Sequence, residues 1–131
     1  MQLPEHYYDE IFPFSGAWGM PSRCGLKIIR KAGKSYVIVT ELYQDNPGDS
    51  VTSAGRLLAE QICRAKGLHP EDVVYLECNP GMNSKLSFYD EEYYEVNFSN
   101  PRQATYRLLS QEEADELFDR PERAPVKQKA T

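Results

Sequence analysis

The most constraining feature of the sequence is one amphipathic helix that lies between two short apolar runs. Apolar residues recur at helical spacing on one stripe, with Leu57 beside it: Val51, Ala54, Leu58, Ile62 and Ala65. Gly67 and Pro70 follow, and this pair is typical of a helix end, so we predict a helix over 51–66. Apolar runs at 36–42 and 73–78 predict a buried strand on each side. The sequence leaves open whether these strands are parallel and adjacent; if they are, the helix is a right-handed crossover between them.

Further strand signals surround this unit. They fall at residues 26–42 (a hairpin turning at 31–34), 86–89, 93–98 and 104–109. Ser110 and Glu113 then form an S-x-x-E capping box, which predicts a short helix through Phe118. The order of elements predicts a two-layer α+β fold, with the main helix packed on one face of a mixed sheet of four to five strands.

The chain has 131 residues, a length that suits one domain with a single core. We predict that this domain covers residues 1–119. Within it, residues 1–23 are rich in proline, glycine and aromatic side chains, and we expect an irregular segment. Residues 120–131 carry prolines and mixed charge with little apolar content, so we expect a disordered tail.

Charge and cysteine content limit the partners and the compartment. The formal net charge is −5, which disfavours binding to a nucleic-acid backbone. No apolar run approaches the roughly 20 residues of a membrane span, and residues 1–10 lack the pattern of a secretory signal. The 3 cysteines are an odd number without close pairing, which favours free thiols and a reducing compartment. We therefore expect a cytoplasmic protein that binds neither membrane nor nucleic acid.

The tripeptide Asn-Pro-Gly occurs twice, at 46–48 and 79–81, each time after a predicted strand. If strands 36–42 and 73–78 are parallel, both turns lie beyond the carboxyl ends of the strands, where ligands bind in open α/β sheets. The candidate binding residues at this edge are Glu41, Asp45, Asn46, Ser50, Thr52, Glu77 and Asn79. The plainer alternative is turn chemistry alone, because proline and glycine suit tight turns wherever a strand must stop.

No known catalytic, metal or cofactor motif accompanies these turns. The sequence lacks a phosphate-binding G-x-x-x-x-G-K-[ST] loop, and Asp45 and Asp49 would repel an anion at the helix start. Acidic oxygens suit Mg²⁺ or Ca²⁺, but their spacing does not match an EF-hand. The cysteines and histidines show no zinc-binding pair. We predict no catalytic residues, no metal and no cofactor.

Residues 37–62 read "VIVTELYQDNPGDSVTSAGRLLAEQI". This stretch resembles a pattern in small uncharacterised bacterial proteins, in which a hydrophobic strand is followed by TEL, DNPG, SVT and a helix. The resemblance covers residues 37–78 at most. It implies a bacterial cytoplasmic origin and no particular activity.

We therefore expect a non-enzymatic binding or accessory protein, for which a protein partner is one option; the oligomeric state is not predicted. One alternative is a small hydrolase or transferase that uses Glu41, Asp45 and Glu77 as acid/base groups or metal ligands. Another is an inhibitor that mimics nucleic-acid charge. Its candidate surface combines the helix at 111–119 with four nearby acids, Asp90, Glu91, Glu92 and Glu95.

Overall fold

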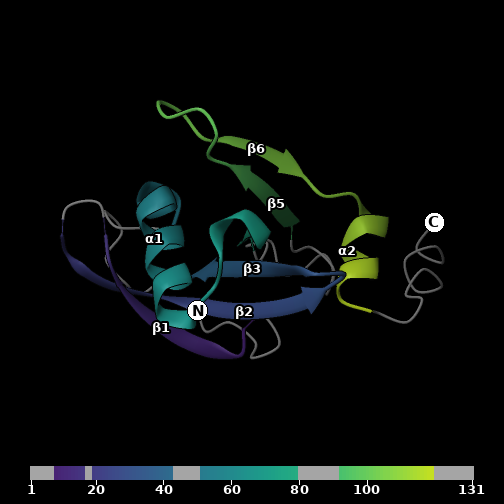
Figure 1. Ribbon diagram of the computed structural model, residues 1–131, viewed down its shortest axis with the longest axis horizontal. Helices are drawn as coiled ribbons and strands as arrows, with labels where there is room; N and C mark the ends of the chain where they lie inside the picture. The colour runs from purple at the N-terminus through teal and green to yellow at the C-terminus, as the bar shows by residue number, and fades with distance from the viewer. Residues whose placement is uncertain (1–7, 17–18, 43–50, 80–91, 120–131) are drawn as a thin grey trace, which may run out of the picture.

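The structure, a computed structural model, describes residues 8–16, 19–42, 51–79 and 92–119. These residues form a mixed sheet of six strands with two α-helices (Figure 1). The elements are β1 (Glu10–Ser15), β2 (Pro21–Lys31), β3 (Lys34–Glu41), α1 (Val51–Lys66), a short 3-10 helix η3 (Pro70–Asp72), β4 (Val73–Asn79), β5 (Glu92–Asn97), β6 (Thr105–Leu108) and α2 (Gln111–Leu117). The α+β class is confirmed, whereas the predicted number of four to five strands is wrong.

The strands lie in the sheet in chain order, β1-β2-β3-β4-β5-β6. Only the β3–β4 pair among these strands is parallel, and α1 connects its two members. Residues 36–42 and 73–78, whose relative direction the sequence left open, therefore belong to adjacent parallel strands. Their carboxyl ends lie at the same edge of the sheet.

Helix α1 has the predicted bounds, Val51–Lys66. Gly67 adopts a φ of 68°, and the Leu68 N–H donates to the Cys63 carbonyl at 2.9 Å, which closes the helix end as predicted. The predicted stripe is buried except for its last member, because Ala65 is exposed. Leu57 is also exposed.

The helix is kinked at Gly55, where the backbone leaves helical geometry. Gly55 is buried against Phe98, whose ring carbon would lie 3.6 Å from an added Cβ. The kink therefore sits where the helix meets the chain that leaves β5.

Two apolar cores lie on opposite faces of the sheet. The larger core packs α1 against β1 to β5, with Leu58 and Ile62 fully buried at its centre. The smaller core packs α2 against β3, β4 and β5, through Ala114 and Leu117. The main helix covers one face of the sheet as predicted. Because α2 covers the other face, the two-layer arrangement that we expected describes only part of the fold.

The irregular segment predicted for residues 1–23 is wrong for its described part. Residues 10–15 form the edge strand β1, and β2 already begins at Pro21. Phe12 and Phe14 alternate inward from β1 while Pro13 is exposed, an arrangement that an edge strand tolerates. Tyr8 covers Gly25, where an added Cβ would lie 2.6 Å from the tyrosine ring, so this position of β2 requires glycine.

The remaining predictions divide between described and undescribed residues. The capping box at Ser110 and Glu113 is confirmed, with both reciprocal hydrogen bonds present. The predicted strand at 86–89 and the tail at 120–131 lie outside the described residues, and the domain boundary at 119 stays a prediction. Across the part of the chain described, no helix has the length and apolar character needed to cross a bilayer.

Candidate functional site at the carboxyl ends of β3 and β4

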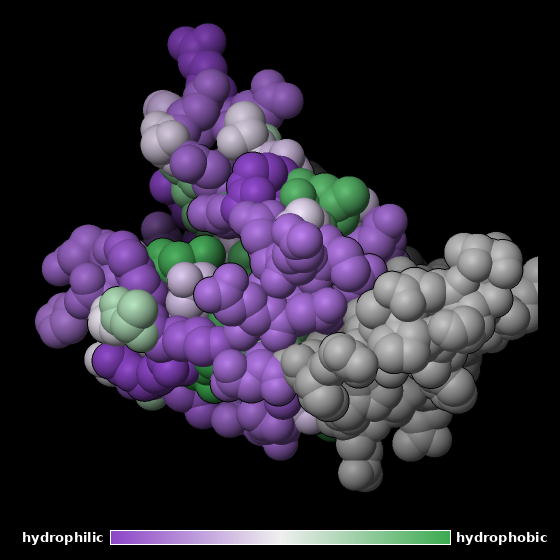
Figure 2. All heavy atoms as spheres, turned by 90° about the vertical axis from the view of Figure 1, so that its right-hand side faces the viewer, coloured by the Kyte–Doolittle hydropathy of each residue, from purple (hydrophilic) through white to green (hydrophobic). Residues whose placement is uncertain are grey.

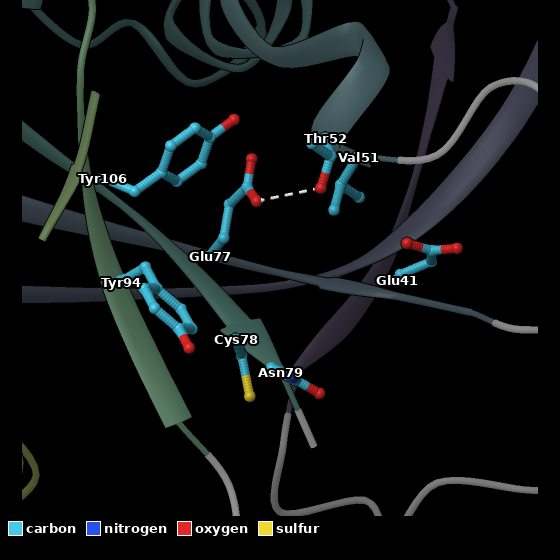
Figure 3. Close-up of a pocket in the computed structure, with 8 residues that line it drawn as sticks. All are labelled: Glu41, Val51, Thr52, Glu77, Cys78, Asn79, Tyr94 and Tyr106. Carbon is cyan, nitrogen blue, oxygen red and sulfur yellow. Dashed lines mark hydrogen bonds between the residues drawn. The ribbon is translucent and has the colours of Figure 1, made fainter. Parts of the chain in front are cut away.

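A cavity of about 360 Å³ opens where β3 and β4 end and α1 begins. Its described lining residues are Glu41, Val51, Thr52, Glu77, Cys78, Asn79, Tyr94 and Tyr106 (Figure 3). They come from five elements: β3, α1, β4, β5 and β6. The parallel pairing of β3 and β4 creates this site, because it brings Glu41, Glu77 and Asn79 to one edge and lets the start of α1 lie above it.

Four of the seven predicted binding residues line this cavity, namely Glu41, Thr52, Glu77 and Asn79. The other three, Asp45, Asn46 and Ser50, lie outside the described residues. The two Asn-Pro-Gly turns also fall there, apart from Asn79. The structure therefore brings together every predicted site residue that it describes.

Glu77 is the unusual member of the site. Its side chain rises from β4 towards the first turn of α1 (Figure 3), and the residue is only 7% exposed. The hydroxyl of Thr52 donates to its Oε1 at 3.2 Å. Its other oxygen, Oε2, is buried and has no hydrogen-bond partner among the described residues. A buried acceptor without a partner is unfavourable, since folding has removed the water that would otherwise bind it.

Burial also changes the protonation of this carboxyl. Desolvation is the main cause that raises the Glu77 pKa from 4.5 to about 7. The hydrogen bond from Thr52 lowers the pKa, and the nearby charge of Glu41 raises it further. Burial likewise raises the pKa of Glu41, which is half-buried on the neighbouring strand. Near pH 7, Glu77 therefore exchanges readily between a carboxylic acid and a carboxylate.

The aromatic part of the lining was missed by the sequence reasoning. Tyr94 is the cross-strand neighbour of Glu77 on β5, and Tyr106 lies on β6 with 44% of its surface exposed. In Figure 3 the Tyr106 ring extends towards the Glu77 carboxyl. The Tyr94 hydroxyl donates to Glu92 Oε1 at 2.7 Å. A strand was predicted over residues 93–98, but no sequence signal gave the register that sets Tyr94 beside Glu77.

The geometry of the described residues gives little support to a metal site or to chemistry at a cysteine. No group of three or more Asp, Glu, His or Cys side chains converges on a metal-sized site in the described part of the chain. Cys78 lines the cavity but is 4% exposed, and none of the three cysteines, Cys24, Cys63 and Cys78, forms a disulfide. The site is thus an acidic cavity with aromatic walls.

Comparison with known proteins does not supply a function for this cavity. No protein family, curated protein or solved structure matches the chain.

Proposed function

We propose that the chain is a non-enzymatic binding protein, and that the cavity at the carboxyl ends of β3 and β4 is its binding site. The single observation behind this proposal is the Glu77 carboxyl, which is buried in the cavity with one oxygen unpartnered among the described residues. Such a group weakens the fold, and destabilising polar groups persist at sites where function requires them. A ligand that donates a hydrogen bond to Oε2 would remove the penalty.

The location agrees with this proposal. Ligands of open sheets with parallel strands bind beyond the carboxyl ends of those strands, where connecting loops and helix starts meet. The cavity lies between the parallel strands β3 and β4 and the first turn of α1. It is large enough for a small organic ligand or for one side chain of a protein partner.

We place this binding protein in the bacterial cytoplasm. The absence of disulfides at all three cysteines supports a reducing compartment. The bacterial origin rests on the resemblance of residues 37–78 alone.

A second candidate function is supported by the same carboxyl. A glutamate whose pKa is about 7 is suited to general acid or base catalysis at neutral pH. A hydrolase or transferase would use Glu77 for proton transfer with Glu41 nearby. The binding function is preferred, because the described lining offers no set of donors arranged to stabilise a developing negative charge, although the Thr52 hydroxyl does donate to Glu77.

The charge-mimicking inhibitor is less well supported. Part of its proposed acidic surface is already neutralised, because Arg107 pairs with both Glu95 and Glu113 at 2.9 and 3.1 Å. Lys31 lies at the end of α2 and pairs with Asp119 at 2.9 Å. Asp90 and Glu91 lie outside the described residues.

Fragment binding followed by amide NMR tests the binding function. The protein is titrated with small neutral, anionic and cationic probes, and shifts are followed at Glu41, Thr52 and Asn79. We expect at least one class of probe to shift these amides together, and Glu77→Gln to weaken that binding. Glu71→Gln, an identical change at an exposed position on η3, is the matched control. If no class of probe shifts the cavity amides, the proposed function is wrong.

A further inference from the structure

We propose that the group this cavity binds is an alkylammonium ion, paired with the carboxyl of Glu77, with Glu41 as the second acid of the lining. This inference rests on the proposed binding function and specifies the chemistry of its ligand. The sources of such a group are a free amine and the lysine side chain of a protein partner, and both present the same cation on an alkyl chain.

The charge of the lining favours a cation. Its described residues include two glutamates and no lysine, arginine or histidine. The positive end of α1 does not reverse this preference, because Glu77 already lies at the first turn and accepts a hydrogen bond from Thr52. An incoming phosphate or carboxylate would therefore lie against two acidic groups that repel it whenever they are ionised.

The unpartnered oxygen defines the required ligand atom. In the carboxylate form of Glu77, Oε2 is an acceptor, so its missing partner in that form is a donor. An ammonium group carries three N–H donors and no acceptor. One donor satisfies Oε2, and the half-buried carboxyl of Glu41 is the nearest second anion that the described lining supplies.

The rest of the cavity fits the alkyl chain of such a cation. A volume of about 360 Å³ far exceeds one ammonium group, leaving room for several methylenes. Val51 contributes an apolar wall at the helix start, and the rings of Tyr94 and Tyr106 contribute aromatic walls. Aromatic faces attract organic cations and their adjoining methylenes. A hard metal ion is less well matched, since it requires about six oxygen ligands and the described carboxyls number two here.

Binding of a cation should be linked to proton release from Glu77. Among the described residues, the charged and titratable groups that face Glu77 are Glu41 on β3, Tyr75 on its own strand, Tyr94 on β5 and Tyr106 on β6; Thr52 of α1 faces it with a neutral hydroxyl. The tyrosines stay neutral below pH 8, because their pKa values are raised above 10.0. The Glu77 pKa of about 7 therefore sets the pH dependence. Since an ammonium ion favours the carboxylate, its affinity should rise as pH increases through 7.

A titration with n-butylammonium at pH 6, 7 and 8 tests this inference. The amine itself stays charged throughout, with a pKa of roughly 10. If the cation binds only the carboxylate form, the affinity should increase about tenfold between pH 6 and pH 8. n-Butanol and n-butyrate are probes of similar size and different charge, and they should bind more weakly. The amide of N-acetyl-lysine tests the side-chain source against the free amine.

Variants complete the experiment. Glu77→Gln should weaken n-butylammonium binding and remove its dependence on pH, whereas Glu41→Gln should weaken binding and retain that dependence. Glu71→Gln should leave both unchanged. Tighter binding of butanol or butyrate in this cavity would preserve the binding function but overturn the ammonium assignment, as would amine binding that does not vary between pH 6 and 8. If none of the probes binds the cavity, both proposals are wrong.

Discussion

On the face of the sheet that α2 covers, charged side chains are exposed and paired, whereas on the face that α1 covers a carboxyl is buried and half-partnered. On the α2 face, Arg107 bridges Glu95 of β5 and Glu113 of α2, and all three side chains are more than a third exposed. On the α1 face, Glu77 is 7% exposed and one of its oxygens has no partner among the described residues.

Backbone groups at both ends of α2 also have side-chain hydrogen-bond partners. Ser110 and Glu113 cap the start of α2, and Lys31 lies at its end, donating to the Glu116 carbonyl and, at 3.2 Å, to the Leu117 carbonyl. A cation at the end of a helix complements the helix dipole. Figure 2 views the molecule from the right-hand side of Figure 1, where α2 lies. It shows a mainly hydrophilic surface with separate small hydrophobic areas. The charged groups described on the α2 face are therefore paired, whereas the α1 face contains a buried carboxyl that stability alone does not explain.

The largest expected difference between the two faces is in their apolar cores. Leu58→Ala removes a fully buried side chain from the larger core and should lower the free energy of unfolding by roughly 2–5 kcal/mol. Leu117→Ala should cost less, because its helix is short and the core it joins is smaller. Denaturant unfolding measures both. Equal losses would show that α2 contributes as much to the fold as α1.

The second expected effect is the pH dependence of Glu77. Its pKa is higher in the folded protein than in the unfolded chain, so the folded state holds the proton more tightly and loses stability as pH rises from 4.5 to about 7. The full loss amounts to about 3 kcal/mol. Glu77→Gln should remove it, making the variant more stable than the natural protein at pH 8 and equally stable below pH 4.5.

Unfolding curves at several pH values measure this effect. A stabilising effect of Glu77→Gln that is larger in acid than at pH 8 would mean that Glu77 is paired and ionised in the folded state. The comparison between the two faces would then fail, because both would contain only satisfied charges.

The smallest expected effect is at the helix cap of the α2 face. Ser110→Ala removes the hydroxyl that accepts from the Glu113 N–H at 3.1 Å, and should cost about 1 kcal/mol. Because this cap is exposed and α2 packs on the opposite face of the sheet from the cavity, the variant should bind n-butylammonium as the natural protein does. Loss of binding in this variant would show that the two faces are coupled.

The sequence predicts the strand–helix–strand unit well because its signals are local. The stripe from Val51 to Ile62 gives the buried face of α1, and Gly67 gives its end. The strand β1 was missed because Pro13 and the surrounding aromatic residues resemble a loop, whereas an edge strand accommodates proline. Ala65 was misassigned because helical period alone does not show where the sheet stops covering the helix.

The residues of the candidate site likewise fall into those that local sequence signals predict and those whose place depends on tertiary structure. Glu41, Glu77 and Asn79 were predicted because they follow or end apolar strands whose parallel pairing defines one edge. Tyr94 and Tyr106 were missed because their place depends on the register of β5 and β6. The burial of Glu77 also depends on tertiary structure, since it is the start of α1 that covers the carboxyl.

The most direct test of this account is the pKa of Glu77 itself, measured by carboxyl-carbon NMR with and without n-butylammonium. Glu77→Gln identifies the resonance by its loss. We predict that Glu77 titrates near pH 7 in the free protein, because it is buried, and that its pKa is lower when the amine is bound. A free-protein pKa near the ordinary value of 4.5, unchanged by the amine, would contradict it.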